Sequence, residues 1–266
     1  MNGPVTAPAA ASPLRACLRS CIPLPLRRLW NAGLVYRQLW RSYERATGNR
    51  LSRRRVIGDF GRWMRSLDHG RSPIADRAPW IVYDARRALE GRLDRSARVC
   101  EFGAGGSTLF FLDRGCEVVS IEHDGAWLEL VRGALPVGAR WTCHLEPPRA
   151  LGTTEAGVRT YRSGSPGYEN DSFEAYVRSI DHSPDGHFAA VFVDGRARAD
   201  ALLAAMPKVA PGGCLVLDNA ERERYAAVID TLRRRGWRET RCAGPGPYVR
   251  YEFWETRIFE RPEESE

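Results

Sequence analysis

Lysine is almost absent from this sequence, because Lys208 is the only one among its 40 lysine and arginine residues. We attribute this arginine excess, together with abundant alanine, to a GC-rich genome rather than to a binding preference. No apolar run reaches 18 residues, so the sequence predicts no membrane-spanning helix. No C-x-x-C pair occurs among the seven cysteines. An odd number of cysteines without pairing spacing predicts reduced thiols and a cytoplasmic protein.

The positive charge is concentrated at the N-terminal end of the chain. Residues 1–55 contain eleven arginines and one acid, Glu44, so their net charge is +10, whereas the formal net charge of the whole chain is +7. The remaining residues therefore carry −3 and are mildly acidic. We divide the chain into a basic arm, residues 1–55, and a domain, residues 56–266. The hydrophobic content of the whole chain, 43%, can supply one large core. Residues 1–13 are small, polar or proline, and predict disorder.

Residues 24–46 predict an amphipathic helix within the arm. Their apolar residues recur at roughly helical spacing, with arginines between them: Leu26, Trp30, Leu34, Trp40 and Tyr43. Such a stripe can pack on the domain while its arginines face water. A basic amphipathic helix can also lie on an anionic membrane surface or bind nucleic acid, and an arginine-rich, acid-poor segment can be an organelle transit peptide. The sequence leaves these alternatives open.

The most informative stretch begins at Arg98. Residues 98–102 form an apolar run that predicts a buried strand, and Gly103-Ala-Gly-Gly106 follows as a turn where backbone can approach a ligand. Ser107 or Thr108 can begin a helix through Leu112. Residues 118–121 predict a second strand, with Glu122 at its tip, nineteen residues after Gly103. This is half of a βαβ nucleotide-binding unit, with an acid placed for ribose hydroxyls.

Two classes of ligand use such a unit, and two residues separate them. A dinucleotide site needs Gly or Ala at the sixth position of the glycine pattern, where this chain has Thr108. Glu101 would repel a diphosphate but suits the cationic methyl donor S-adenosylmethionine. A nicotinamide-dependent oxidoreductase is therefore the weaker interpretation.

The segment Glu101-Phe-Gly-Ala-Gly-Gly-Ser107 resembles the first motif of class I S-adenosylmethionine-dependent methyltransferases. Ile121-Glu-His-Asp124 resembles their second motif, whereas Ser107 replaces the usual third glycine, as in catechol-type O-methyltransferases. The resemblance implies an α/β fold with a Rossmann-like doubly wound sheet of about seven strands, the last one antiparallel. It implies donor contacts from one set of residues: Glu101, Gly103, Ala104, Gly105, Gly106, Ser107, Glu122, His123 and Asp194.

The other expected elements fit this fold. Strands are predicted at 139–145, 189–194, 214–219, 237–242 and 253–260, and residues 56–97 should form N-terminal helices. A helix over Pro79–Leu89 would cover the donor pocket, which makes Trp80 and Tyr83 candidate pocket walls. Residues 146–171 contain four glycines and three prolines without a clear pattern, and predict either a substrate lid or a disordered loop.

Polar residues end two of the predicted strands. Asp194 follows one, and Asp218-Asn219 ends the next, a pattern that resembles the divalent-cation ligands of catechol-type O-methyltransferases. These oxygens suit Mg²⁺, which would acidify a bound hydroxyl, and Asp194 is also the candidate catalytic base. Alternatively, Asp194 contacts the donor and the other two residues cap a helix. Arg196 and Arg198 can hold an acidic substrate or face water.

We expect O-methylation of a small hydroxylated molecule, a phenol or a sugar. A nucleic-acid adenine methyltransferase would carry Asn/Asp-Pro-Pro-aromatic where this chain has Asp194-Gly-Arg-Ala, so nucleic acid is disfavoured as a substrate. The alternative outside enzymology is an adapter that keeps the fold and binds a membrane or partner through the arm.

Overall fold

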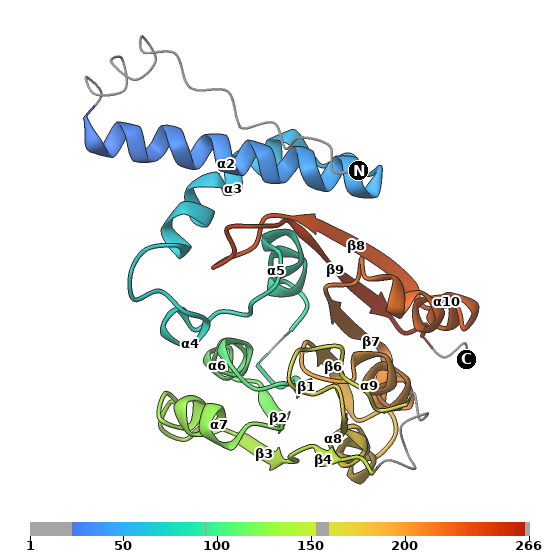
Figure 1. Ribbon diagram of the computed structural model, residues 1–266. Helices are drawn as coiled ribbons and strands as arrows, with labels where there is room; N and C mark the ends of the chain where they lie inside the picture. The colour runs from blue at the N-terminus through green and yellow to red at the C-terminus, as the bar shows by residue number, and fades with distance from the viewer. Residues whose placement is uncertain (1–22, 94, 153–159, 264–266) are drawn as a thin grey trace.

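The computed structural model describes residues 23–93, 95–152 and 160–263 (Figure 1). The predicted disorder of residues 1–13 and the middle of the segment 146–171 lie outside these ranges. None of the helices in the described part of the chain combines the length and the apolar character that a membrane span requires.

A seven-stranded sheet forms the centre of the molecule, with the strand order β3-β2-β1-β6-β7-β9-β8. All neighbouring strands are parallel except at β9, which is antiparallel to β7 and to β8. The predicted Rossmann-like doubly wound sheet with an inserted antiparallel last strand is therefore confirmed. The strands are β1 (Arg98–Phe102), β2 (Glu117–Glu122), β3 (Trp141–Leu145), β6 (Phe188–Val193), β7 (Val209–Asp218), β8 (Arg238–Gly244) and β9 (Trp254–Glu260).

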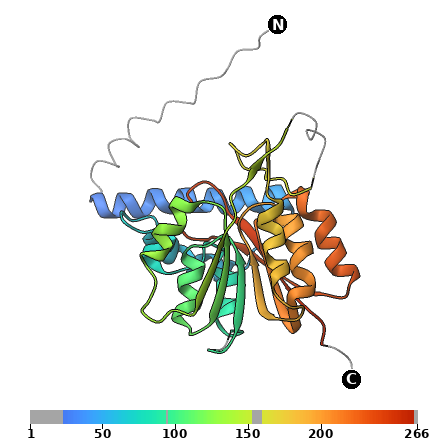
Figure 2. The ribbon, with the colours of Figure 1, turned by 90° about the horizontal axis from the view of Figure 1, so that it is seen from below.

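Helices cover both faces of the sheet (Figure 2). Side chains alternate along a strand, so Val99 packs on one face with α5 and α6, while Cys100 and Phe102 pack on the other with α8, α9 and α10. A small separate ribbon, β4 with β5, pairs residues near the two ends of the segment 146–171, which was predicted to be a lid or a disordered loop. The elements are α5 (Tyr83–Glu90), α6 (Gly106–Asp113), α7 (Gly125–Arg132), β4 (Arg149–Ala150), β5 (Asp171–Ser172), α8 (Glu174–Arg178), η2 (Ser179–His182), α9 (Arg198–Ala205), η3 (Met206–Lys208), η4 (Glu223–Tyr225) and α10 (Ala226–Arg234).

Three helices precede this core: α2 (Leu24–Thr47), α3 (Arg53–Ser66) and α4 (Pro73–Asp76). Helix α2 forms the outer edge of the molecule beyond β8 and β9 (Figure 1). Its residues Tyr36, Leu39 and Tyr43 are buried in a cluster with Trp63 of α3 and Phe253. The C-terminal half of the predicted basic helix therefore packs on the domain. The domain boundary predicted at residue 55 stays a prediction.

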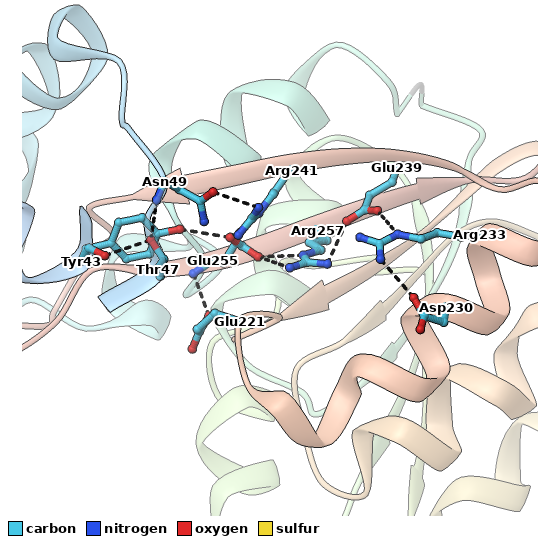
Figure 3. Close-up of polar contacts among 10 residues, drawn as sticks. All are labelled: Tyr43, Thr47, Asn49, Glu221, Asp230, Arg233, Glu239, Arg241, Glu255 and Arg257. Atoms are coloured by element: carbon cyan, nitrogen blue, oxygen red, sulfur yellow. Dashed lines mark hydrogen bonds and ion pairs between the residues drawn. The ribbon is translucent and has the colours of Figure 1, made fainter. Parts of the chain in front are cut away.

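A polar network fixes α2 to the last two strands (Figure 3). The Tyr43 hydroxyl donates to Glu255 Oε2 at 3.0 Å, and the Arg241 guanidinium donates to the same oxygen at 2.5 Å. Arg257 donates to the other oxygen, Glu255 Oε1, at 2.7 Å and to Glu239 at 2.9 Å. Glu255 is fully buried, and these donors supply the compensation that a buried carboxylate requires.

Two predicted boundaries are wrong. The helix expected from Pro79 begins instead at Tyr83, because Val82 is extended and the Tyr83 amide donates to the Pro245 carbonyl at 3.0 Å. The strand expected from Cys214 begins instead at Val209 and includes Pro211-Gly-Gly.

Candidate functional site

The glycine turn, the tip of β2 and the end of β6 meet in one cavity of about 320 Å³. This is the carboxyl edge of the parallel strands, where doubly wound sheets bind their ligands. All but one of the residues predicted to contact the donor line it: Gly103, Ala104, Gly105, Gly106, Ser107, Glu122, His123 and Asp194. Trp80, Asp124, Trp127 and Arg196 line it too, as does Pro73.

Two of the glycines in the turn have a structural reason, one conformational and one steric. Gly103 has φ +100°, a conformation that L side chains rarely adopt. A Cβ at Gly106 would collide with the carbonyl oxygens of Pro73 and Ala78, which lie beside the start of α6. The turn therefore holds the segment before α5 against the cavity.

Glu122 is almost fully buried, yet its carboxylate faces the cavity. Its Oε2 accepts from the Ala104 amide at 2.9 Å, and its Oε1 accepts from the amides of His123 and Asp124 at 2.7 and 2.9 Å. Burial alone would raise the pKa of Glu122, but the hydrogen bonds from His123 and Asp124 outweigh it and leave this pKa below its ordinary value. The carboxylate is therefore ionised and fixed in place.

Glu101 does not line the cavity. Its carboxylate accepts from Ser107 and Ser120 at 2.6 Å each and also from Thr108, so three hydroxyls enclose it. Burial raises the pKa of Glu101 to about 7, against the lowering effect of these hydroxyls. The sequence led us to expect this acid beside a cationic ligand; its direct contacts are instead with residues of the turn and of β2.

The side of the cavity beyond His123 is aromatic and basic. The Arg196 guanidinium donates to His123 Nε2 at 3.2 Å and to Ser165 Oγ at 2.5 Å, and lies 4.9 Å from the centre of the Tyr168 ring. His123 also makes an edge contact with Tyr168. The described part of the segment 146–171 thus lies against two residues that line the cavity. A lid function for this segment stays a prediction.

The three residues predicted to bind magnesium converge on a guanidinium. Arg198 Nη2 lies 3.0 Å from Asp194 Oδ1, while its Nη1 donates to Asn219 Oδ1 at 3.0 Å and lies 3.9 Å from Asp218 Oδ2. The other Asp218 oxygen accepts from Trp254 and Thr256 at 2.9 and 2.6 Å. The described residues contain no group of three or more histidine, cysteine, aspartate or glutamate side chains that could hold a metal. The magnesium prediction is not supported, because Arg198 already supplies the positive charge that these oxygens require.

Burial raises the pKa of both acids beside Arg198, which are Asp194 and Asp218. The pKa of Asp218 rises to about 7, because burial and the neighbouring Asp194 raise it more than Arg198 lowers it. Burial also raises the pKa of Asp194, again against Arg198. Only the Asp194 side chain, 36% exposed, combines a raised pKa with access to the cavity.

The sequence misjudged two aromatic residues near the cavity, Tyr83 and Trp127. Tyr83, a predicted pocket wall, packs in the cluster with Tyr36 and does not line the cavity. Trp80, the other predicted pocket wall, lines it. Trp127 was missed, although it lies in the first turn of the helix after Glu122, near any ligand at that acid. Its indole donates to the Ala104 carbonyl at 2.7 Å and braces the turn.

No model of a known protein family matches the sequence, and no curated protein matches it. Solved structures do match. A protein from Corynebacterium glutamicum is 12% identical over 79% of this chain and 99% of its own, with a TM-score of 0.52. A methyltransferase-like protein from Silicibacter pomeroyi is 19% identical over 68% of this chain and 87% of its own, with a TM-score of 0.45. A predicted O-methyltransferase from Agrobacterium tumefaciens is 18% identical over 64% and 76%, with a TM-score of 0.40.

At these identities the likeness is one of fold. The chain therefore has a Rossmann-like fold, with the antiparallel last strand that its resemblance to class I methyltransferases implies.

Proposed function

We propose that the protein is an S-adenosylmethionine-dependent methyltransferase. One observation carries the proposal: the cavity at the glycine turn is lined by three carboxylates, Glu122, Asp124 and Asp194, and by one guanidinium, Arg196. Such a cavity favours a ligand with positive charge, and the methyl donor carries both a sulfonium and an ammonium group. A dinucleotide brings a diphosphate, which these acids would repel.

The backbone amides of the turn support the same choice. A diphosphate would need free amides in the glycine turn and at the start of α6. The Ala104 amide of the turn donates to Glu122, and the Gly105 amide donates to Thr108 Oγ1 at 2.9 Å. A diphosphate that used these two amides would have to displace both protein contacts.

The residues of the cavity suggest a role for each group. Glu122 Oε2 has one protein donor, the Ala104 amide, and can accept from a ribose hydroxyl as well. The Gly103–Ser107 turn admits the amino-acid part of the donor, and His123 and Trp127 flank these groups. Glu101 is a positioning residue, because it orients the hydroxyls of Ser107 and Thr108. The donor supplies a methyl group already activated by the sulfonium. The protein must hold an acceptor in line with that methyl group and exclude water.

We further propose that the acceptor is a small hydroxylated molecule, a phenol or a sugar, with residues 146–171 as the lid over it. His123, Arg196 and Tyr168 offer one polar and aromatic wall for such a molecule. Asp194 is the proposed base: its raised pKa suits proton removal near neutral pH better than that of an ordinary aspartate. Arg198 holds that carboxylate at 3.0 Å, so this mechanism needs no metal.

Calorimetry with S-adenosylhomocysteine tests the donor site. We expect micromolar affinity, weakened roughly 10- to 100-fold in Glu122→Ala, because a charged acceptor of hydrogen bonds is lost. Glu129→Ala is the matched control, since Glu129 lies on α7 with a side chain that is 69% exposed. No binding at millimolar ligand, or tighter binding of a nicotinamide dinucleotide, would contradict the proposal.

A screen of metabolite extracts for transfer of a labelled methyl group tests the acceptor. We expect label in a small molecule, in the presence of a chelator as well as in its absence. Label only in nucleic acid or protein would refute the small-molecule acceptor. Donor binding without any transfer would favour the adapter, and loss of transfer in chelator would restore the metal mechanism.

A further inference from the structure

Helix α2 has two apolar stripes, and the fold uses only one of them. The buried stripe contains Tyr36, Leu39 and Tyr43, spaced three and four residues apart along one side of the helix. Tyr36 donates to the Val56 carbonyl at 2.6 Å and Tyr43 donates to Glu255. This stripe explains why α2 packs on the molecule.

The second stripe lies in the N-terminal half of α2, roughly a third of a turn away around the helix. Its side chains are Leu26, Trp30 and Leu34, and they are 55%, 63% and 45% exposed. Single exposed apolar residues are normal on a protein surface, but three on adjoining positions of one helix form a patch, and such patches mark interaction sites.

The same face of α2 continues with arginines. Arg37 and Arg41 follow Trp30 at seven and eleven positions, so all three lie on one side of the helix. Together with Arg50 and Arg53 they line a groove of about 460 Å³ between α2 and α3. The only acid in this groove, Glu44, accepts from the Leu51 amide at 2.9 Å. No ion pair of these four arginines occurs within the described ranges. We call these three apolar residues and these four arginines the α2–α3 surface.

Charge decides which occupant the α2–α3 surface fits. A second copy presenting the same surface would bring like charges together. Residues 1–22 of this chain contain two arginines and no acid, so they have no charge complementary to it. Nucleic acid would satisfy the arginines but would leave the exposed leucines and Trp30 in water. An anionic bilayer satisfies both, because its phosphates meet guanidinium groups while leucine and tryptophan side chains enter the headgroup boundary.

We propose that the α2–α3 surface docks the protein on anionic phospholipid membranes. Each basic residue near such a surface contributes about fivefold to the partition coefficient, the equivalent of about 1 kcal/mol. Arg37→Gln with Arg41→Gln should therefore weaken binding about 25-fold. Trp30→Ala should weaken it about tenfold or more, because a large apolar side chain no longer leaves water.

Sedimentation of the full chain with vesicles tests this proposal. One set of vesicles contains equal parts of phosphatidylglycerol and phosphatidylcholine, and the other contains phosphatidylcholine alone. We expect binding to the first set only, reduced at high salt, which screens the arginines. Matched controls are Leu130→Ala on α7, where Leu130 is 61% exposed, and Arg235→Gln after α10; both should bind like the unaltered chain.

Several outcomes would overturn the proposal. They are absence of sedimentation with anionic vesicles, binding that Trp30→Ala and the double arginine variant leave unchanged, and equal loss in the two controls. An oligonucleotide titration adds one more: tight binding that depends on the arginines but not on Trp30 would make nucleic acid the occupant. Circular dichroism of each variant separates a loss of binding from a loss of folding, because all substituted residues are on the surface.

Discussion

Replacing Glu101 by glutamine should change how the stability of the protein depends on pH. Glu101 is the one acid of the glycine turn that is enclosed by hydroxyls rather than exposed to the cavity, and burial raises its pKa from 4.5 to about 7. Glutamine is nearly the same size but does not titrate. The comparison therefore isolates the proton that Glu101 binds in the folded state.

The sign follows from the two pKa values. Below about pH 4.5 the carboxyl group is protonated in both the folded and the unfolded chain. Between pH 4.5 and 7 the unfolded chain ionises first, so the stability of the unaltered protein falls as pH rises, and above pH 7 the loss is complete. A shift of this size corresponds to about 3 kcal/mol. Glutamine carries only a constant cost, because its amide nitrogen cannot accept a hydroxyl hydrogen bond.

Urea unfolding of both proteins between about pH 5 and 8, followed by tryptophan fluorescence, measures this difference. Relative to the unaltered protein, Glu101→Gln should gain most of the 3 kcal/mol as pH rises. Titration of Asp218 occurs in both proteins and cancels. Glu129→Gln, a change of an exposed carboxylate on α7, is the control and should show no comparable gain. A difference between Glu101→Gln and the unaltered protein that does not vary with pH would refute the raised pKa.

Two further substitutions test a close contact and a buried hydrogen bond. Gly106→Ala should cost about 1–3 kcal/mol of unfolding free energy, because its Cβ would collide with two backbone oxygens. Gly58→Ala in α3 is the control and should not destabilise the protein, because Gly58 has open space around it. Urea unfolding that ranks these two variants the other way would contradict the structure. Tyr43→Phe should cost about 1–3 kcal/mol, because it leaves the buried Glu255 one donor short. Tyr251→Phe is its control and should have little effect, because Tyr251 is 74% exposed. Equal thermal denaturation midpoints for these two variants would show that the Tyr43 bond contributes nothing.

The central sheet was predictable from sequence because its signals are local. Strand β6 and the C-terminal half of β7 are short apolar runs, and the acid at the end of each marks the edge where ligands bind. The glycine turn and Glu122 are close in sequence, so their meeting in one cavity follows from the βαβ unit itself.

The partners of the buried acids were not predictable in the same way. Glu101 faces Ser120 only because β1 and β2 pair with Glu101 opposite that residue. Arg198 was considered as a substrate ligand or a surface charge, and its distance of four residues from Asp194 was the available signal for an ion pair. That it also reaches Asp218 and Asn219 depends on the pairing of β6 with β7, which is a contact between distant parts of the chain.

The arm shows the limit of periodicity. Of the five apolar positions emphasised in the sequence, Leu26, Trp30 and Leu34 are exposed, whereas Tyr43 is buried and Trp40 packs against the same cluster. Tyr36 and Leu39, which were not emphasised, are buried too. A helix with two apolar stripes does not itself indicate which one meets the domain. The choice is made by α3 and Phe253, which supply the other side of the cluster.

The bond from Tyr43 to Glu255 spans 212 positions of the chain, and the one from Trp63 to Val249 spans 186. A ribosome adding about 5–20 residues per second needs roughly 10 to 40 seconds to travel from one end of the longer span to the other. During that interval α2 and α3 are already synthesised, but the segment around Val249 and Glu255 that they pack against is not. Nascent chains should therefore present both apolar stripes of α2 to chaperones, and the first helices made should be among the last to dock.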